Sequence, residues 1–475
     1  MPLRPLPLLL TLAASVARAQ GAPPSPSPSS GNPPAASFAG DFAPSATAGA
    51  ETGVDDKWHT SLYGFVELDG MHDSTGSYGA AANNAMLARP SSYAATHGRA
   101  QVTANNSQLG VIAAAPVYRC LKATAQAEID FFGIQPSDAT EQTTYTLGSV
   151  RMRLFFVKLE GPVVDVIAGQ YHDLYAWGGA GFYPSSVAFL GLPGQIYRRQ
   201  PQLRVSKTLG QRVQVELAAA AVRPVQRDGE VPDLQGGLRL MVNDRKGWGA
   251  QGFGRPDRLP LRVGLSGLAR RFAVAEFLAM PGGPRIAYGW GLAANLFLPI
   301  IAASSAGDRG NALTITAEVT TGSGISDLYT QLTGGALFPT LSNPGGVDPP
   351  PLYRPNIDSG IVTYDGNGNL KPIRWDAVVV GLQYYLPVAA GRVWVSGTFS
   401  LLRSSNLLEL TPVASRGGIY TRLDYFDGNL FYALTPAVQM GASYQTTHQV
   451  FGDHPVGVTA ETRNHRAEAA LRYFF

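Results

Sequence analysis

Apolar and polar residues alternate, one by one, along many segments of this chain. From Leu121 to Asp130 the odd positions hold Leu, Ala and Ile, and the even positions hold Lys, Thr, Gln, Glu and Asp. Successive side chains of a β-strand point to opposite faces, so this period predicts strands with one apolar face. The same period recurs in Leu62–Asp69, Arg212–Leu217, Leu313–Val319 and Arg392–Ser400. We therefore expect an all-β chain.

The polar faces of these segments carry little charge. Charged residues make up 15% of the chain, whereas a soluble domain usually carries roughly 25%. Thr, Ser, Gln and Gly fill most polar positions, which suits a water-filled interior with the apolar face turned to lipid. No stretch reaches the roughly 18 apolar residues of a membrane-spanning helix, and a single Cys excludes a disulfide scaffold. A large soluble all-β protein remains the alternative to a transmembrane β-barrel.

Two segments precede the first predicted strand. Residues 1–19 begin with a positive charge, continue with an apolar stretch and end on Ala17-Arg18-Ala19, the small-x-small pattern of a signal-peptidase site. We expect a secretory signal peptide there; the alternative is an N-terminus that is apolar by chance. Residues 20–58 are rich in Pro, Ser, Ala and Gly, a composition that buries too little apolar surface to fold. We expect a flexible periplasmic linker.

The chain ends on another alternating segment, Ala467 to Phe475. Its odd positions are apolar and its last residue is aromatic. This segment resembles the C-terminal targeting strand of bacterial outer-membrane barrels. The resemblance assigns outer-membrane targeting to Leu471, Tyr473 and Phe475, and it implies recognition by the barrel-assembly machinery.

The number of alternating segments sets the size of the barrel. About sixteen to eighteen of them lie between Thr60 and Phe475, and bacterial barrels use even strand numbers. A sheet in lipid must close, because an open edge leaves backbone groups without hydrogen bonds. We therefore predict that residues 59–475 form a transmembrane antiparallel β-barrel of about 16 strands, with long outer loops and short periplasmic turns. Cys120 is expected on an inward-facing strand position.

One connection is too long and too aromatic for a simple loop. Residues 171–199 follow the predicted strand Val163–Gln170 and contain Gly pairs that permit a tight return path. In general porins a loop after an early strand folds inward and narrows the pore. We expect residues 171–199 to do so; the alternative is an outer loop packed on the rim.

Four motifs carry a family resemblance. LYGFVELDGMHDS at Leu62–Ser74 looks like the first strand of DcaP-like trimeric porins, and AQAEIDFFG at Ala125–Gly133 is similar to their third strand. AGQYHDLYAW at Ala168–Trp177 resembles the start of the family's inward loop, with Tyr and His where Thr and Trp are usual. PGQIYRRQPQLRVSK at Pro193–Lys207 resembles the strand that follows.

The resemblance implies a homotrimer in the outer membrane of a Gram-negative bacterium, in contact with membrane lipids and lipopolysaccharide. It implies passive diffusion of small hydrophilic solutes, with a preference for small anions such as dicarboxylates. It covers the first half of the chain well and the second half only by architecture and the terminal Phe. The family often carries an N-terminal coiled coil where this chain has a Pro-rich segment, and the Leu337–Arg374 insertion has no obvious counterpart.

Local charge agrees with an anion preference. Residues 195–285 contain 16 Lys plus Arg but 7 Asp plus Glu, an excess of +9, against +3 for the whole chain. Arginines lining a narrow pore concentrate anions and bind carboxylates in a fork. Some of these charges can instead lie in turns or pair with acids such as Glu216. The residues predicted to line the constriction are Arg151, Arg153, Tyr171, Tyr175, Trp177, Arg198, Arg199, Arg204, Arg212 and Arg239.

Other functions stay open at this stage. Aromatic residues form a sliding track in a sugar or oligosaccharide channel, and long loops suit a plugged structural or adhesive barrel. The sequence has no H-E-x-x-H or G-x-S-x-G motif, so we predict no enzyme activity, cofactor, metal site or nucleic-acid partner. Asp365-Gly-Asn-Gly-Asn369 is similar to the start of a calcium loop, but Leu370 stands where that loop needs Gly, which favours a Gly-Asn turn.

Overall fold

A computed structural model describes most of the chain after residue 56. The described residues are 57–79, 86–133, 148–178, 182–188, 192–250, 256–276, 282–302, 308–330, 357–358, 360–452 and 460–475. The predicted signal peptide and all but the last two residues of the predicted linker lie outside them. The chain divides into two units, residues 1–37 and 38–475, and everything described below belongs to the second.

Strands dominate the described residues. The wall strands are β1 (His59–Asp73), β2 (Arg99–Thr103), β3 (Gln108–Ala114), β4 (Lys122–Asp130), β5 (Arg151–Glu160), β6 (Asp165–His172), β7 (Arg199–Leu209), β8 (Val213–Val222), β9 (Asp233–Ala250), β10 (Pro256–Ala275), β11 (Pro284–Ile301), β12 (Leu313–Ser323), β15 (Arg374–Tyr385), β16 (Val393–Ser404), β17 (Tyr420–Ala433), β18 (Val438–Phe451) and β19 (Glu461–Phe474). A separate hairpin pairs β13 (Val362–Tyr364) with β14 (Leu370–Pro372).

The helices between the strands are short. They are α2 (Tyr93–Thr96), α4 (Leu407–Leu410) and the 3₁₀ turns η1 (Tyr175–Trp177), η2 (Arg227–Gly229), η4 (Ser326–Leu328), η6 (Ala389–Gly391) and η7 (Val413–Gly418). Within the described part of the chain, no helix combines the length and apolar character needed to cross a membrane.

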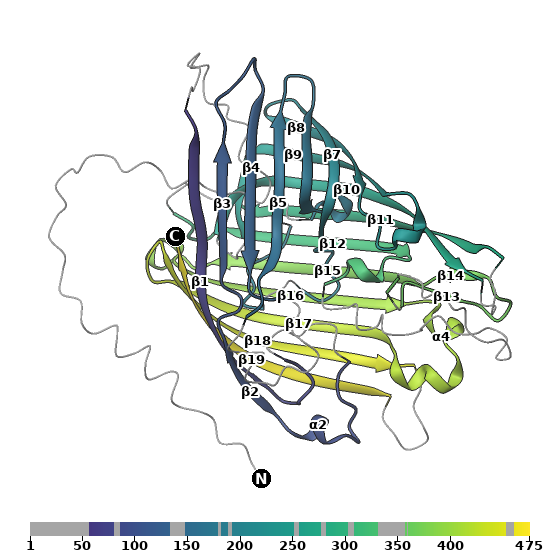
Figure 1. The fold of residues 1–475 in the computed structure, drawn as a ribbon. Helices are drawn as coiled ribbons and strands as arrows, with labels where there is room; N and C mark the ends of the chain where they lie inside the picture. The colour runs from purple at the N-terminus through teal and green to yellow at the C-terminus, as the bar shows by residue number, and fades with distance from the viewer. Residues whose placement is uncertain are drawn as a thin grey trace, which may run out of the picture. The chain divides into compact units, whose positions relative to one another are not determined.

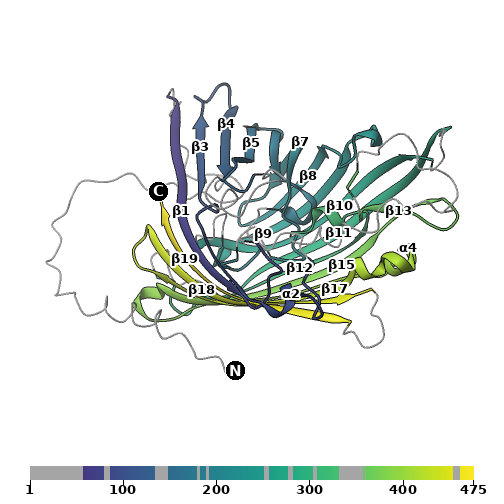
Figure 2. The ribbon, with the colours of Figure 1, turned by 60° about the horizontal axis from the view of Figure 1, so that its bottom comes forward.

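The wall closes on itself through its first and last strands. From β3 to β19 each wall strand pairs antiparallel with the next, and β1 pairs with β19 from Phe65↔Phe474 to Asp73↔Arg466. β2 and β3 pair with successive parts of β1, so together they fill one strand position. The result is a closed barrel of sixteen strand positions, which confirms the predicted fold. Both ribbon views show β1 beside β19 (Figures 1 and 2).

The barrel is apolar outside and polar inside. On β19 the side chains of Leu471, Tyr473 and Phe475 face outward and remain 48%, 53% and 45% exposed, while Glu468 and Arg472 face inward and are buried. The same alternation runs through β15, where Val380 and Leu382 face outward. A soluble sheet buries its apolar face, so this inverted arrangement is that of a membrane-spanning barrel.

The lengths of the connections give the barrel its orientation. The start of β1 and Phe475 lie at one end, where the turns 161–164, 210–212 and 434–437 are short. The opposite end carries the longer connections 74–98, 173–198 and 324–373. Because outer-membrane barrels have short periplasmic turns and long extracellular loops, we call these the periplasmic and external ends.

Cys120 lies in the first periplasmic turn, which corrects its predicted place on an inward strand face. Tyr118 and Leu121 form a bridge, and the two residues between them, Arg119 and Cys120, have φ of 48° and 66°. A tight hairpin turn needs positive φ at both central positions, a geometry usually filled by Asn-Gly. Neither residue signals such a turn in the sequence, and the turn leaves the Cys120 thiol exposed.

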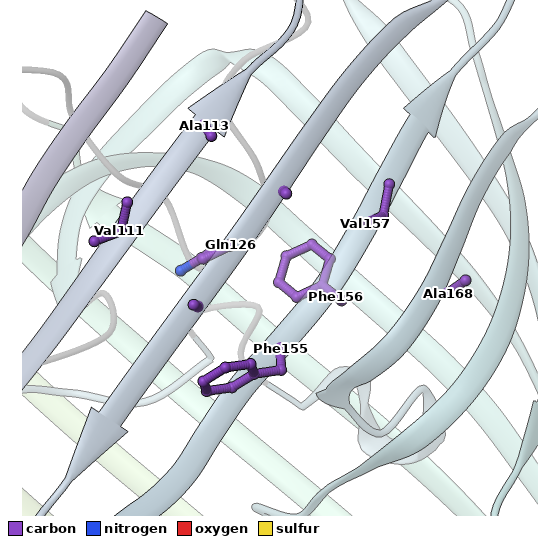
Figure 3. A pocket seen from close by; sticks show the side chains of 9 residues that line it. Val111, Ala113, Gln126, Phe155, Phe156, Val157 and Ala168 are labelled. Atoms are coloured by element: carbon purple, nitrogen blue, oxygen red, sulfur yellow. The ribbon is translucent and has the colours of Figure 1, made fainter.

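A shallow hollow marks the wall formed by β3 to β6 (Figure 3). Its volume is about 410 Å³. The outward-facing Phe155 and Val157 flank it, and small alanine side chains at positions 113, 125 and 168 leave the space open. The hollow is therefore a feature of the outer, lipid-facing wall.

Part of the barrel interior is packed with apolar side chains. Trp375, Leu402 and Tyr420 on the inner wall pack in one buried cluster with Leu192 and Ile196, which come from the connection between β6 and β7. The interior therefore has a packed side along β10 to β18. The charged side chains of β1, β4, β5 and β7 lie outside this cluster.

Candidate pore and constriction

The connection between β6 and β7 enters the barrel and lies against its inner wall. The structure describes residues 173–178, 182–188 and 192–198 of this connection, here called the inward segment. The backbone N–H groups of Leu174 and Tyr175 donate to Oε1 of Gln235 on β9, at 2.7 and 2.9 Å. The next N–H, of Ala176, donates to Oγ of Ser266 on β10 at 2.7 Å. Wall side chains thus satisfy consecutive buried donors of the segment.

Two aromatic side chains of the inward segment sit in a slot lined by glycines. Trp177 Nε1 donates to the carbonyl of Leu265 at 3.1 Å, and the Tyr175 hydroxyl donates to the carbonyl of Leu292 at 3.2 Å. A Cβ at Gly264 would come within 2.6 Å of the Trp177 ring, and one at Gly291 within 2.8 Å of the Tyr175 ring. The missing side chains therefore make room for these rings.

Polar contacts with the wall continue along the rest of the inward segment. Ser185 N donates to Gln383 Oε1 on β15 at 2.6 Å, and Val187 N donates to Asn429 Oδ1 on β17 at 3.0 Å. On the return path Ile196 N donates to Glu318 Oε1 on β12 at 2.8 Å. The inward segment therefore contacts the wall from β9 to β17, and the remaining lumen faces the other strands.

A buried ion network holds the end of the inward segment. Arg198 pairs with Asp327 of η4, and Asp327 also receives Arg270 Nη1 from β10 at 2.6 Å. Arg270 Nε contacts Asp233 of β9 at 2.8 Å. Burial acts to raise the pKa of Asp327, but the Arg270 and Arg198 guanidinium groups outweigh it and lower that pKa. The network ties the inward segment to the wall and to the connection after β12.

Asp173, the first residue of the inward segment, is fully buried beside this network. Among the described residues neither of its carboxylate oxygens has a hydrogen-bond partner. Burial raises the pKa of Asp173 to about 7, and the nearby guanidinium groups of Arg198 and Arg270 oppose that rise. Asp173 is therefore a buried ionisable group at the start of the inward segment.

The inner faces of β4 and β5 carry a second ion network. Arg153 Nε lies 2.6 Å from Glu128 Oε1, and its Nη1 lies 2.9 Å from Asp130 Oδ2. Arg151 pairs with the same Asp130 oxygen at 2.5 Å. Two predicted constriction arginines are thus brought together, and both are paired with acids.

β7 begins at Arg199 and carries Arg204 on its buried inner face. The Arg204 guanidinium lies 5.1 Å from the ring centre of Tyr171 and donates to Oε1 of Gln202 at 3.0 Å. The Arg199 guanidinium lies 5.1 Å from the ring centre of Tyr197. No carboxylate among the described residues forms an ion pair with Arg199, and its buried Nη1 has no hydrogen-bond partner there.

The other predicted residues occupy different environments. Tyr175 and Trp177 are 0% and 2% exposed, so they fix the inward segment to the wall rather than offer surface to solutes. Arg239 pairs with Glu216, the luminal partner foreseen in the sequence. Arg212 is the last residue of the turn before β8, where its side chain pairs with Asp244 and is 82% exposed.

The adjacent strands β1 and β19 add acids to the lumen. Glu67 pairs with Arg472 at 2.5 Å, and Asp73 receives two hydrogen bonds from Arg466 at 2.9 and 2.8 Å. The inner surface therefore carries both signs of charge, mostly as pairs.

Within the described residues, no group of three or more His, Cys, Asp or Glu side chains is arranged to hold a metal ion. Asp365 accepts hydrogen bonds from the N–H groups of Asn367 and Asn369, each at 2.9 Å, in the turn between β13 and β14.

A second connection, between β1 and β2, lies against β18 and β19 at the external end. Leu87 N donates to Gln449 Oε1 on β18 at 2.8 Å, and Thr462 on β19 donates to the carbonyl of Ala88 at 2.9 Å. The Arg89 guanidinium lies 4.1 Å from the ring centre of Phe451. Sequence reasoning missed this contact and the glycine slot, because both depend on residues far apart in the chain.

Comparison with solved structures shows the same fold in an outer-membrane channel. The outer membrane channel DcaP of Acinetobacter baumannii is 17% identical, with a TM-score of 0.61 over 90% of this chain and 99% of that chain. An anion-selective porin from Comamonas acidovorans is 9% identical, with a TM-score of 0.49 over 88% of this chain and 100% of that chain. No protein-family model and no curated protein sequence matches the chain. The expected resemblance to DcaP-like porins is confirmed in the fold, and the closed barrel, apolar outside and polar inside, is that of an outer-membrane protein.

Proposed function

We propose that this protein is a porin for passive diffusion of small hydrophilic solutes, with a preference for small anions such as dicarboxylates. Arg199 carries the proposal, because its guanidinium lies near Arg151 and Arg153 and forms no ion pair with a described carboxylate. Arg204 lies on the same strand with its guanidinium over an aromatic ring. An arginine fork beside a narrow aqueous path raises the local concentration of anions and suits a carboxylate.

The other predicted arginines are paired with acids, which supports assigning the anion preference to Arg199 and Arg204. Arg151, Arg153, Arg198 and Arg239 each face an acid at ion-pair distance. Paired charges cancel over a short distance, so they add little to the average potential in the lumen. The proposed preference for anions then depends on Arg199 and Arg204 of β7, and not on the whole charge excess of +9 in residues 195–285.

Solute flux into proteoliposomes tests the proposal. We expect succinate to enter faster than an uncharged solute of similar size, and Arg199→Gln to reduce that ratio while leaving uncharged flux nearly unchanged. The matched control is Arg119→Gln, which removes the same charge from an exposed periplasmic turn. Equal ratios in the wild type and in Arg199→Gln would contradict the role of Arg199.

The packed interior favours one second candidate, a plugged structural or adhesive barrel. The apolar cluster around Trp375 and Ile196 fills one side of the barrel, and the β1–β2 connection lies against β18 and β19 at the external end. A plugged barrel passes no solute of any charge. The flux experiment therefore separates the two functions.

The proposed assembly follows the DcaP-like resemblance. We propose a homotrimer that contacts membrane lipids and lipopolysaccharide and that the barrel-assembly machinery inserts through Leu471, Tyr473 and Phe475. These three side chains face outward at the closing seam. Phe475 N donates to the carbonyl of Gly64 at 3.1 Å, so the terminal residue is itself part of the closure.

A further inference from the structure

The outer wall changes character toward the external end of β15 to β19. On β16 the outward positions Val395, Phe399 and Leu401 are apolar, and the next outward position is Arg403. On β17 the outward Phe426 and Leu430 give way to Arg422 and Asp424. The transition from apolar to charged marks where the wall leaves the hydrocarbon and meets lipid headgroups.

Two arginines stand directly opposite each other in this region. The register of β16 and β17 pairs Arg403 with Arg422, and both side chains are exposed on the outer face. Like charges in directly opposed positions destabilise a sheet. Arg422 Nη2 has an acid neighbour, Asp424, at 3.0 Å. Arg403 has Asp376 as its cross-strand partner on β15 but forms no ion pair with a described carboxylate. An anion between the two guanidinium groups would relieve the repulsion.

Further basic groups flank this pair. Arg374 on β15 is half exposed, and its Nη2 lies 3.6 Å from Asp376. Arg463 on β19 is exposed, and no described acid pairs with it. The intervening acid Asp424 is shared, because His448 Nδ1 also lies 3.0 Å from it. We name Arg374, Arg403, Arg422 and Arg463 the outer arginine patch.

Apolar side chains lie immediately below the outer arginine patch. Phe399 and Phe426 are cross-strand partners and remain 47% and 52% exposed. They lie four residues from Arg403 and Arg422 along their strands, about 13 Å along each strand on the side toward the membrane centre. A ligand with an anionic head above an acyl chain matches this order of surfaces.

We propose that the outer arginine patch binds a phosphate group of a phosphorylated lipid in the outer leaflet, as carried by the lipid A part of lipopolysaccharide. Arginine guanidinium groups bind phosphate oxygens in bidentate forks, and clustered basic residues at a membrane interface recognise lipid phosphates. The acyl chains then pack on Phe399 and Phe426. This site lies on the outer wall and is independent of solute flux through the lumen.

Lipid binding to the purified full-length protein in detergent micelles tests the proposal. Native mass spectrometry would measure occupancy by diphosphorylated lipid A and by the same lipid without phosphates. We expect the Arg403→Gln/Arg422→Gln variant to lose about tenfold in occupancy by the phosphorylated lipid. The Arg403→Lys/Arg422→Lys variant, which keeps both charges, should retain most of it. The control is Arg119→Gln/Arg392→Gln, which removes two exposed charges at the periplasmic end and should leave occupancy unchanged.

Several outcomes would overturn the proposal. Equal occupancy by the phosphorylated and dephosphorylated lipids would show that phosphate is not recognised. Inorganic phosphate that displaces the lipid at equal concentration would reduce the patch to a simple anion site. Loss of the oligomer in the Arg403→Gln/Arg422→Gln variant, with no lipid bound to the wild type, would assign the patch to a contact between copies of the chain.

Discussion

Ser266 on the inner face of β10 accepts a 2.7 Å hydrogen bond from the backbone N–H of Ala176, a residue with φ of 57°. A non-glycine residue reaches this left-handed region only where its surroundings hold it. The bond therefore fixes the turn that carries Tyr175 and Trp177 into their glycine-lined slot. The position of the inward segment depends on such wall-to-segment contacts.

Removing this acceptor should weaken the barrel. Ser266→Ala leaves the buried N–H of Ala176 without a partner, which costs roughly 1–3 kcal/mol. Urea unfolding of the refolded protein in micelles, followed by tryptophan fluorescence, measures the loss. Ser61→Ala, at an exposed position near the start of β1, is the control and should change the stability by less than about 0.5 kcal/mol. Equal unfolding curves for both variants would show that the contact contributes nothing.

Filling the glycine slot should push the inward segment toward the lumen. A Cβ at Gly264 comes within 2.6 Å of Trp177, so Gly264→Ala forces the ring to move and costs roughly 1–3 kcal/mol of overpacking. Single-channel conductance should fall at the same time. Gly267→Ala on the same strand meets only ordinary contacts at 3.6 Å and is the matched control. Unchanged conductance in Gly264→Ala would mean that the segment does not set the width of the path.

Stability should depend on the protonation of Asp173. Its pKa in the folded protein is about 7, above the ordinary aspartate value of 3.8. The folded state therefore binds the Asp173 proton more tightly than the unfolded state does. The stability that this proton contributes is fully present below pH 3.8 and is lost as the pH rises through 7. Asp173→Asn should unfold like the wild type near pH 4 and exceed its stability at pH 8, by on the order of 2–4 kcal/mol.

Urea titrations at both pH values check this prediction. The exposed Asp365 provides the control, because Asp365→Asn removes an acid whose pKa is lowered by backbone hydrogen bonds that outweigh its slight burial. That variant should lose stability at pH 8 rather than gain it. A gain of equal size in both variants would refute the assignment to Asp173.

The orientation of the barrel places Cys120 on the periplasmic side. It is the only cysteine in the sequence, and its thiol is exposed. A membrane-impermeant maleimide should leave it unmodified in intact cells and modify it after the outer membrane is permeabilised. Mass spectrometry of the purified protein measures the modification. Full modification in intact cells would mean that the long connections face the periplasm.

The fold could be predicted from sequence because it rests on a short-range pattern. The alternation in Leu121–Asp130 and Leu313–Val319 identifies β4 and β12 directly, since each strand must present one face to lipid and one to the lumen. The closing strand likewise follows from the alternation before Phe475. Each of these inferences needs only neighbouring residues.

The pairing of charges could not be predicted in the same way. Arg153 meets Glu128 and Arg198 meets Asp327 only after the barrel closes and the inward segment enters it. The local excess of Lys and Arg gave no indication of which charges are neutralised. Trp177 resembled a pore-lining aromatic for the same reason, because its glycine slot comes from β10 and β11, far from it in the sequence.

The reversal potential of the channel across a salt gradient tests the central claim most directly. The refolded protein in a planar bilayer should conduct, with a reversal potential of the sign that indicates anion preference, and Arg199→Glu should move that potential toward cation preference. A wild-type channel that prefers cations, or a folded barrel that never conducts, would contradict the account.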